Sequence, residues 1–227
     1  MANYTFNDSV RIELKDATLI GDLIIPENAA GLIVFSHGSG SSRLSTRNRF
    51  VAEQLQRAGF ATLLFDLLTE EEDQEYSNRF DIPKITRRLI DTTYWIQKDP
   101  RTQNFNIGLF GASTGAASAI GAAAAEGPDI IKAVVSRGGR PDLAHAVIPD
   151  LQVPTLLIVG GKDTEVLDLN KQAQDLMQCI KDLEIVPDAT HLFEEPGALE
   201  MVAQLAADWF RKYVKPDKQQ PLHQNRP

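Results

Sequence analysis

Short apolar runs alternate with helical patterns along most of the 227-residue chain, and this alternation restricts the possible fold more than any other feature. Runs such as Gly31–Ser36 and Ile107–Phe110 have the composition of strands that are buried on both faces of a parallel sheet. Strands and helices in strict succession form right-handed βαβ units. We therefore predict an α/β fold in which a mostly parallel sheet carries helices on both faces.

The two ends of the chain depart from this alternation. Val10–Leu14 and Leu19–Ile25 are β-rich runs with a short connection, so we expect an antiparallel hairpin that extends one edge of the sheet. Residues 215–227 are polar and contain three prolines, which predicts a flexible tail. The length lies between one and two typical domains, and we expect residues 1–214 to form a single α/β domain.

Composition argues against several classes of function. A net charge of −8 without a dense Lys/Arg block gives no electrostatic basis for binding nucleic acid or an anionic membrane. Cys179 is the single cysteine, which excludes an internal disulfide framework and multi-cysteine metal motifs. The polar N-terminus lacks a signal-peptide pattern, and no apolar run approaches the ~18 residues that span a bilayer. The simplest expectation is a cytoplasmic protein that uses no metal and no organic cofactor.

The segment Gly111-Ala-Ser-Thr-Gly115 lies between a predicted strand and a predicted helix. A nucleophile elbow of the G-x-S-x-G type requires this context, because its sharp turn holds the serine in a strained conformation with Oγ exposed above the sheet. The two glycines would leave room where backbones approach closely. We therefore predict that Ser113 is a nucleophile. The alternative is a small residue at the start of a Gly/Ala-rich helix.

A serine nucleophile needs a base and an orienting carboxylate. His191 follows a predicted strand and precedes the last helix, so it is the predicted base, with a surface histidine as the alternative. Asp163 follows an apolar strand and two glycines and is the predicted acid, with a helix N-cap as its alternative role. Glu165 and Asp188 are close enough in sequence to compete. The order Ser113, Asp163, His191 is that of α/β-hydrolases.

The oxyanion formed on attack needs backbone N–H donors. The N–H of Thr114, next to the nucleophile, is the first expected donor. The second is the N–H of Ser39, in a Gly/Ser loop after an early strand. His37 is interpreted mainly as a brace for this loop, with substrate contact as its second possible role. The loop lacks the Gly-Lys-Ser/Thr ending of a P-loop, so a phosphate cradle is the weaker interpretation.

These motifs resemble the α/β-hydrolase superfamily and, by the compact size of the chain, its dienelactone hydrolase branch. The segments that carry the resemblance are FSHGSGSS, GASTG, VGGKD and ATHLF, within residues 10–214. The resemblance implies an eight-stranded, mostly parallel sheet, a triad of Ser113, His191 and Asp163, and hydrolysis of an ester or lactone through an acyl-enzyme. Dienelactone hydrolases carry a cysteine where this chain has Ser113, so the resemblance implies the mechanism more directly than the dienelactone substrate.

Two features bear on the substrate. Only eighteen residues, 137–154, separate two successive strands where many lipases insert a lid, so we expect an open site for small soluble esters, lactones or thioesters. Arginine binds carboxylate in a two-pronged way, which makes an anionic acyl substrate a further prediction. The alternative is that the arginines pair with the acidic run Glu70–Glu75, which receives no role of its own. The arginines in predicted carboxyl-edge loops are Arg43, Arg47, Arg137 and Arg140.

Two other functions stay open on the sequence. A peptidase or an acyltransferase could use the same triad. A noncatalytic binding module could use the same fold, since a fold does not fix a function. The full set of nucleophile, base, acid and oxyanion loop argues against such a module.

Overall fold

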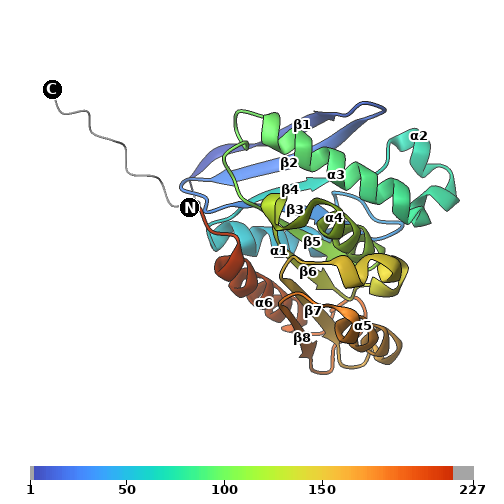
Figure 1. Ribbon diagram of the computed structural model, residues 1–227. Coiled ribbons are helices and arrows are strands. Elements are labelled where there is room, and N and C mark those ends of the chain that lie inside the picture. The colour runs from blue at the N-terminus through green and yellow to red at the C-terminus, as the bar shows by residue number, and fades with distance from the viewer. Residues whose placement is uncertain (1–2, 217–227) are drawn as a thin grey trace.

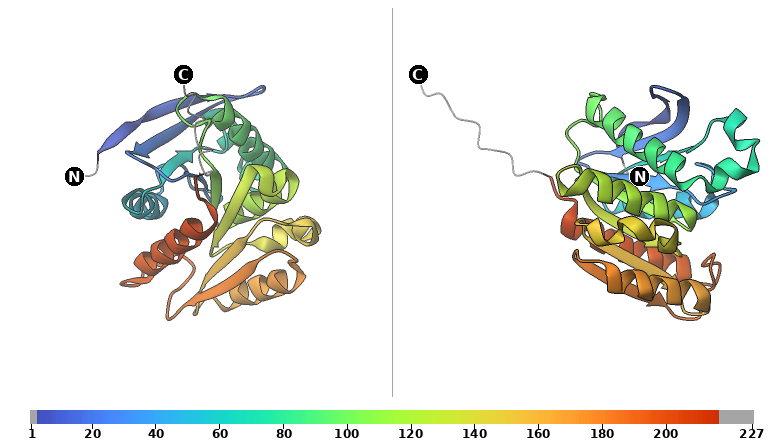
Figure 2. Two further views of the ribbon diagram at one scale, coloured as in Figure 1. Left: turned by 60° about the vertical axis from the view of Figure 1, so that its left-hand side comes forward. Right: turned by 45° about the vertical axis from the view of Figure 1, so that its right-hand side comes forward.

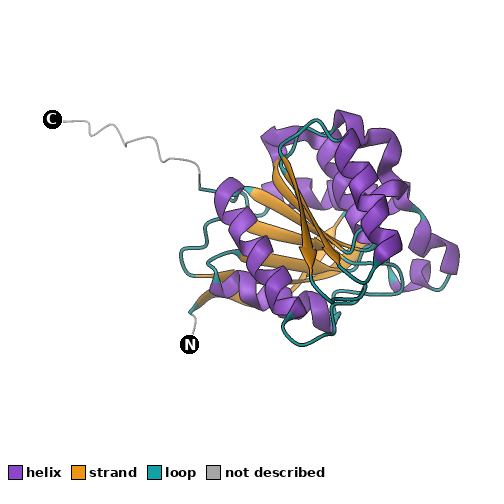
Figure 3. Cartoon of the chain, turned by 90° about the horizontal axis from the view of Figure 1, so that it is seen from below, coloured by secondary structure: helices purple, strands orange, loops and turns teal. Residues whose placement is uncertain are grey.

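The computed structural model describes residues 3–216 and arranges them as a twisted sheet between two layers of helices (Figures 1 and 3). The strands are β1 (Tyr4–Glu13), β2 (Thr18–Pro26), β3 (Leu32–Ser36), β4 (Ala61–Phe65), β5 (Ile107–Ala112), β6 (Ile131–Arg137), β7 (Thr155–Gly160) and β8 (Lys181–Val186). The helices are α1 (Thr46–Arg57), α2 (Glu70–Asp73), α3 (Ile82–Lys98), α4 (Thr114–Ile130), α5 (Thr164–Leu176) and α6 (Ala198–Tyr213), with 3₁₀ segments η1 (Tyr76–Phe80) and η2 (Pro141–Asp150).

The sheet has the order β1-β2-β4-β3-β5-β6-β7-β8. Strands β3 to β8 pair in parallel, whereas β1 pairs antiparallel with β2, and β2 antiparallel with β4. The predicted hairpin at one edge of a mostly parallel, eight-stranded sheet is confirmed.

Both faces of the sheet are buried. Along β3, Leu32 and Val34 pack into one core and Ile33 and Phe35 into the other, all at most 1% exposed. Helices α1 and α6 cover one face, and α3, α4 and α5 cover the other (Figure 2). Because both faces of the strand are buried, its sequence is a continuous apolar run. Burying each such side chain stabilises the folded state by roughly 1.5–3 kcal/mol.

The order of the strands places the candidate site. The chain runs from β3 to β4 on one side and later returns to β5 on the other side of β3. The loops that leave β3 and β5 therefore diverge and open a crevice at the carboxyl edge of the sheet, where such folds bind ligands. The loop after β3 contains His37 and Ser39, and β5 leads directly into Ser113.

Three short helical elements lie in segments for which the sequence predicts no helix. The acidic run contains the helical turn α2, followed by η1, and the connection between β6 and β7 contains η2 rather than a lid. The sequence pattern predicts a helix over Leu167–Ile180, but α5 ends at Leu176, because Met177 leaves helical geometry and buries its side chain in the core.

Most of the predicted tail, residues 217–227, lies outside the described part of the chain. Between residues 3 and 216, no helix is long and apolar enough to cross a membrane.

Candidate active site

Ser113 lies on a strained turn between β5 and α4, with φ 53° and ψ −122°. A non-glycine residue in this region costs about 1–3 kcal/mol and persists only where its surroundings enforce it. A Cβ atom at Gly111 would lie 2.4 Å from the Cα of Ala116, and one at Gly115 would lie 2.2 Å from the carbonyl oxygen of Ser36. The steric role predicted for the two glycines is confirmed.

Backbone hydrogen bonds fasten this turn to the end of β6. The N–H of Ser113 donates to the carbonyl of Arg137 at 3.2 Å, and the N–H of Arg140 donates to the carbonyl of Ser113 at 3.1 Å. Among residues 3–216, none hydrogen-bonds the Ser113 hydroxyl, which lies against Gly38 of the loop after β3. Catalytic hydrogen bonds are often long without substrate and tighten only in the reacting complex.

Asp163 and His191 come from the loops after β7 and β8 and form a hydrogen bond of 2.6 Å between Oδ2 and Nδ1. A proton on Nδ1 that is donated to the carboxylate leaves Nε2 free to accept one. The two loops are fastened together, because the N–H of Lys162 donates to the carbonyl of Ala189 at 2.9 Å. A Cβ at Gly160 would lie 2.4 Å from that carbonyl oxygen, so this approach needs glycine.

The competing acids lie elsewhere. Asp163 occupies the N-cap position of α5, but its side chain makes no capping hydrogen bond and bonds to His191 instead. Asp188 pairs with Lys162 at 3.2 Å, and its side chain is 82% exposed. Glu165 lies in the first turn of α5 and is exposed. Within the described residues, Asp163 is therefore the carboxylate that hydrogen-bonds this histidine.

Gly138 connects the histidine to the elbow. It follows Arg137, whose carbonyl holds Ser113, and it has a φ of +52°. A Cβ at this position would lie 3.3 Å from the carbonyl oxygen of His191 and 3.5 Å from its Nδ1. One short stretch of backbone thus touches both the elbow and the histidine, which brings Ser113 and His191 to the same edge of the sheet.

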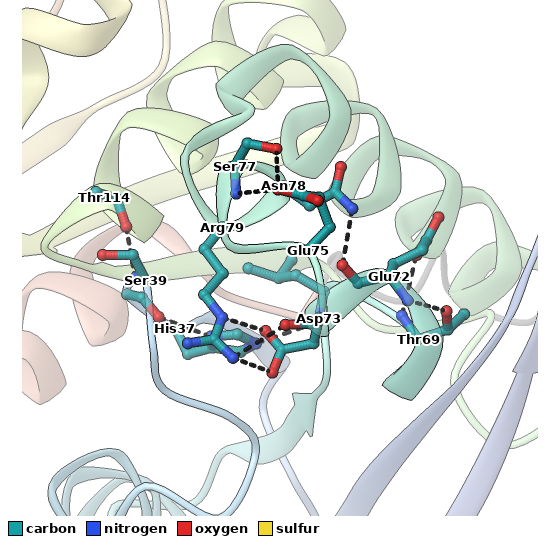
Figure 4. Close-up of polar contacts among 12 residues, drawn as sticks. His37, Ser39, Thr69, Glu72, Asp73, Glu75, Ser77, Asn78, Arg79 and Thr114 are labelled. Carbon is teal, nitrogen blue, oxygen red and sulfur yellow. Dashed lines mark hydrogen bonds and ion pairs between the residues drawn. The ribbon is translucent and has the colours of Figure 1, made fainter.

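The loop after β3 differs from the expectation in one hydrogen bond. The N–H of Ser39 donates to the side-chain hydroxyl of Thr114 at 2.7 Å (Figure 4). The N–H of Thr114 lies in the first turn of α4, where backbone N–H groups have no acceptor within the helix. Of the two predicted oxyanion donors, Thr114 N–H is thus available, whereas Ser39 N–H already has a partner.

His37 uses both ring nitrogens within this loop region. Its Nδ1 bonds to the carbonyl of Gly38 at 3.0 Å, and its Nε2 accepts from the N–H of Leu67 at 3.1 Å. Burial lowers the pKa of its ring, which favours the neutral form that these two bonds require. This arrangement fits the predicted brace and leaves neither nitrogen for the substrate contact also considered for His37.

The acidic run, expected as a solvated loop, forms the helical turn α2, none of whose residues is buried, and arginines hold two of its carboxylates. Glu72 accepts from Arg88 at 2.8 Å, and Arg88 is 3% exposed. Asp73 receives two hydrogen bonds of 2.8 Å from the guanidinium of Arg79 (Figure 4). Arg79 also lines a narrow hollow with Ser39. Segment α2–η1 therefore brings Asp73 and Arg79 to the hollow beside the loop after β3.

The carboxyl-edge arginines do not pair with the acidic run, so that alternative is wrong. Arg43 pairs with Asp66 and Asp22, and Arg47 pairs with Glu194 at 3.1 Å. Arg140 pairs with its neighbour Asp142 at 2.7 Å. These pairings leave Arg43 and Arg47 already neutralised at the positions where substrate contact was predicted.

Arg137 is the exception. It is 7% exposed, its Nη2 donates to Asn48 Oδ1 at 3.3 Å, and its guanidinium lies 5.8 Å from the ring of Phe193. Its buried Nε has no hydrogen-bond partner, and no carboxylate pairs with it in the described part of the chain. Burial, together with the nearby charge of Arg47, lowers its pKa to about 10. Arg137 therefore carries an uncompensated positive charge one strand away from Ser113.

The family model of the dienelactone hydrolase family matches residues 20–215. The chain belongs to the dienelactone hydrolase family. It is 50% identical to the crystallised dienelactone hydrolase of Anabaena variabilis, with a TM-score of 0.90, over 92% of this chain and 99% of that one. It also shares its fold with Est1E of Butyrivibrio proteoclasticus, at 17% identity and a TM-score of 0.77, over 90% of this chain and 98% of that one.

A curated relative comes from Mycobacterium tuberculosis and carries the provisional name of a phosphoribosyl transferase. The two proteins are 53% identical over 204 residues, which are 90% of this chain and 46% of the relative. The chain thus spans about half the length of this relative. Membership in the dienelactone hydrolase family supports a hydrolase.

Sequence reasoning missed two side chains of the site, the Thr114 hydroxyl and Arg79. The sequence pattern predicts a role only for the backbone N–H of Thr114. Arg79 lies in a stretch without periodic apolar pattern, between the acidic run and α3. Its position beside Ser39 depends on the salt bridge with Asp73, which no local sequence signal specifies.

Proposed function

We propose that the protein is a serine hydrolase that cleaves small carboxylic esters, lactones or thioesters through an acyl-enzyme. The observation that carries this proposal is the 2.6 Å hydrogen bond between Asp163 and His191 at the edge where Ser113 is held at φ 53°. A serine hydroxyl is a weak nucleophile without a base that an acid orients. Membership in a hydrolase family supports the same chemistry.

In the proposed reaction, Ser113 Oγ bonds to the carbonyl carbon while His191 Nε2 takes its proton. The π electrons move onto the carbonyl oxygen, and Asp163 stabilises the imidazolium. The carbonyl re-forms as the bond to the leaving group breaks, and His191 returns the proton to the departing oxygen or sulfur. Water then attacks the acyl-enzyme with the same assistance, which releases the carboxylic acid and restores Ser113.

The exposure of the site supports small substrates. The side chain of His191 is 38% exposed, and the β6–β7 connection holds only η2. Arg137 supports an anionic group on the substrate, because a carboxylate would supply the negative charge that this buried guanidinium lacks in the described residues. Short acyl chains and a carboxylate are thus the proposed substrate features.

The transferase name of the mycobacterial relative describes a protein of which this chain matches less than half. The residues gathered at the present site are a hydroxyl, an imidazole and a carboxylate, which are the groups of acyl transfer. We therefore propose hydrolysis for this chain.

A fluorophosphonate probe tests the nucleophile. The wild type is expected to be labelled and Ser113→Ala to be unlabelled. Ser9→Ala, at an exposed position in β1 far from the elbow, is the matched control and is expected to be labelled like the wild type. Equal labelling of Ser113→Ala and the wild type would show that another residue reacts. p-Nitrophenyl acetate should be hydrolysed faster than its long-chain analogues, and a preference for long chains would contradict the open site.

A further inference from the structure

The hydrogen bond between Ser39 and Thr114 determines which protons remain for an oxyanion. A backbone N–H has one proton, and that of Ser39 already points at Thr114 Oγ1 at 2.7 Å. The Thr114 hydroxyl is thereby an acceptor, and its own proton has no acceptor among residues 3–216. Thr114 is 5% exposed, so its hydroxyl lies at the inner end of the site. Thr114 therefore holds two unused donors, its backbone N–H and its hydroxyl.

We propose that Thr114 supplies both hydrogen bonds to the oxyanion, one from its backbone N–H and one from its side-chain hydroxyl, and that Ser39 acts only through that hydroxyl. This inference rests on the proposed serine hydrolase function and names a donor that the reaction needs. The N–H and hydroxyl of a threonine in the first turn of a helix can reach one anion together, where the helix dipole also favours negative charge.

The oxyanion forms when Ser113 attacks the carbonyl group of the substrate. When Ser113 Oγ bonds to the carbonyl carbon, the π electrons move onto the carbonyl oxygen, which then accepts both Thr114 hydrogen bonds. No proton leaves Thr114, and the electron pair returns to the carbonyl when the leaving group departs. An N–H donated to the hydroxyl oxygen polarises the O–H and strengthens its hydrogen bond to the next acceptor. Ser39 is accordingly a positioning residue, and Thr114 is a catalytic one.

The fit of the surrounding glycines explains how the hydroxyl is held in place. A Cβ atom at Gly115 would lie 2.5 Å from the carbonyl oxygen of His37, so the start of α4 is pressed against the loop after β3. His37 in turn fixes that loop through Gly38 and Leu67. The distance between Ser39 and Thr114 is thus set by two rigid segments rather than by a mobile side chain.

Substitutions of Thr114 test the proposal. Thr114→Val keeps the shape and the backbone N–H but removes the hydroxyl, and we expect kcat for p-nitrophenyl acetate to fall about 10²- to 10³-fold with little change in KM. Thr114→Ser should retain most of kcat. Thr93→Val removes another fully buried threonine hydroxyl, in α3, and serves as the matched control with kcat near the wild-type value.

The opposite result is equally specific. If Ser39 N–H donated directly to the oxyanion, Thr114→Val would free that N–H, and kcat would stay constant or rise; this result would overturn the proposal. Phenylboronic acid forms a tetrahedral adduct with Ser113 that places an oxygen at the position of the oxyanion. The affinity for this compound should fall in Thr114→Val, as kcat does, and should be close to the wild-type affinity in Thr114→Ser. Unchanged boronate affinity would also contradict it.

A folding defect can be separated from these outcomes. If Thr114→Val fails to fold, the pair Thr114→Ser and Thr114→Ala repeats the comparison without the branched side chain, and equal kcat values in that pair would overturn the proposal. Labelling of Ser113→Ala distinguishes a failure of the proposed serine mechanism from a failure of the proposed role of Thr114. Full labelling of Ser113→Ala would refute the serine mechanism. Loss of labelling in Ser113→Ala, together with a wild-type kcat in Thr114→Val, would refute only the role of Thr114.

Discussion

The loops that follow β3 and β8 each bring a histidine to the carboxyl edge of the sheet, and the two histidines are used differently. His37 is partly buried and bonds to two backbone groups, so both of its nitrogens are occupied. His191 is 38% exposed and bonds through one nitrogen to Asp163, which leaves the other available. The two histidines therefore differ in whether the second ring nitrogen has a partner, and this difference distinguishes the loop brace from the proposed base.

The largest effect should come from His191. His191→Gln removes the proposed base, and we expect kcat to fall by roughly 10⁵- to 10⁶-fold, as for other triad histidines. His37→Gln should lower kcat by less than tenfold, because no proton moves through that ring. Steady-state hydrolysis of p-nitrophenyl acetate measures both. Similar losses in the two variants would remove the distinction between the loops.

The next effect concerns the partner of His191. Asp163→Asn should reduce kcat about 10⁴-fold, because the amide no longer holds the required tautomer. Glu165→Gln and Asp188→Asn change acids of the same region that do not touch His191, and they should leave kcat near the wild-type value. If kcat fell as much in Asp188→Asn as in Asp163→Asn, the assignment of Asp163 as the orienting acid would be wrong.

Arg137, at the end of β6, is bonded to Asn48 in α1 and lies near Phe193 of the loop after β8. We expect Arg137→Met to raise KM for a carboxylate-bearing ester about 10- to 100-fold, the value of a charge-assisted hydrogen bond. KM for a neutral ester of the same shape should change little, and Arg211→Met on α6 controls for general loss of charge. Equal increases for both esters would rule out an anion site.

Stability should separate the two histidines in the opposite direction. His37→Gln disturbs bonds to Gly38 and Leu67 inside the protein, so we expect the free energy of unfolding to fall by about 1–3 kcal/mol. His191→Gln should cost less, since that side chain is partly exposed. Urea denaturation at pH 7 measures both values, and a larger loss in the His191 variant would contradict the assigned roles.

The pH dependence of stability should be the smallest effect. Burial lowers the pKa of His37 from its ordinary value of 6.5, so between the two values the unfolded chain binds more protons than the folded one. The free energy of unfolding should therefore decrease as pH falls below 6.5 and continue to decrease until the lowered pKa is passed. His37→Gln should flatten this slope in urea titrations between pH 7 and pH 5. An unchanged slope would assign the acid sensitivity to other groups.

The sequence by itself determined that a sheet lies between two layers of helices and which residues form the turn around Ser113. Two-sided apolar strands such as Leu32–Ser36 can be buried only between two layers of helices, and the spacing of Gly111 and Gly115 around Ser113 left few alternatives to a tight turn. Both features depend on local patterns. The prediction of α5 failed at its end because a buried contact of Met177, which is tertiary, outweighed the helical pattern.

Only the tertiary structure decided which polar groups meet. The bond from Asp163 to His191 spans 28 residues, and the bond from Ser39 to Thr114 spans 75. The partners of Arg43 and Arg137, which are Asp66 and Asn48, likewise come from elements distant in the sequence. Hydrogen bonds act over about 3 Å and depend on direction, so their partners follow from how strands and loops pack, and no local sequence pattern encodes that packing.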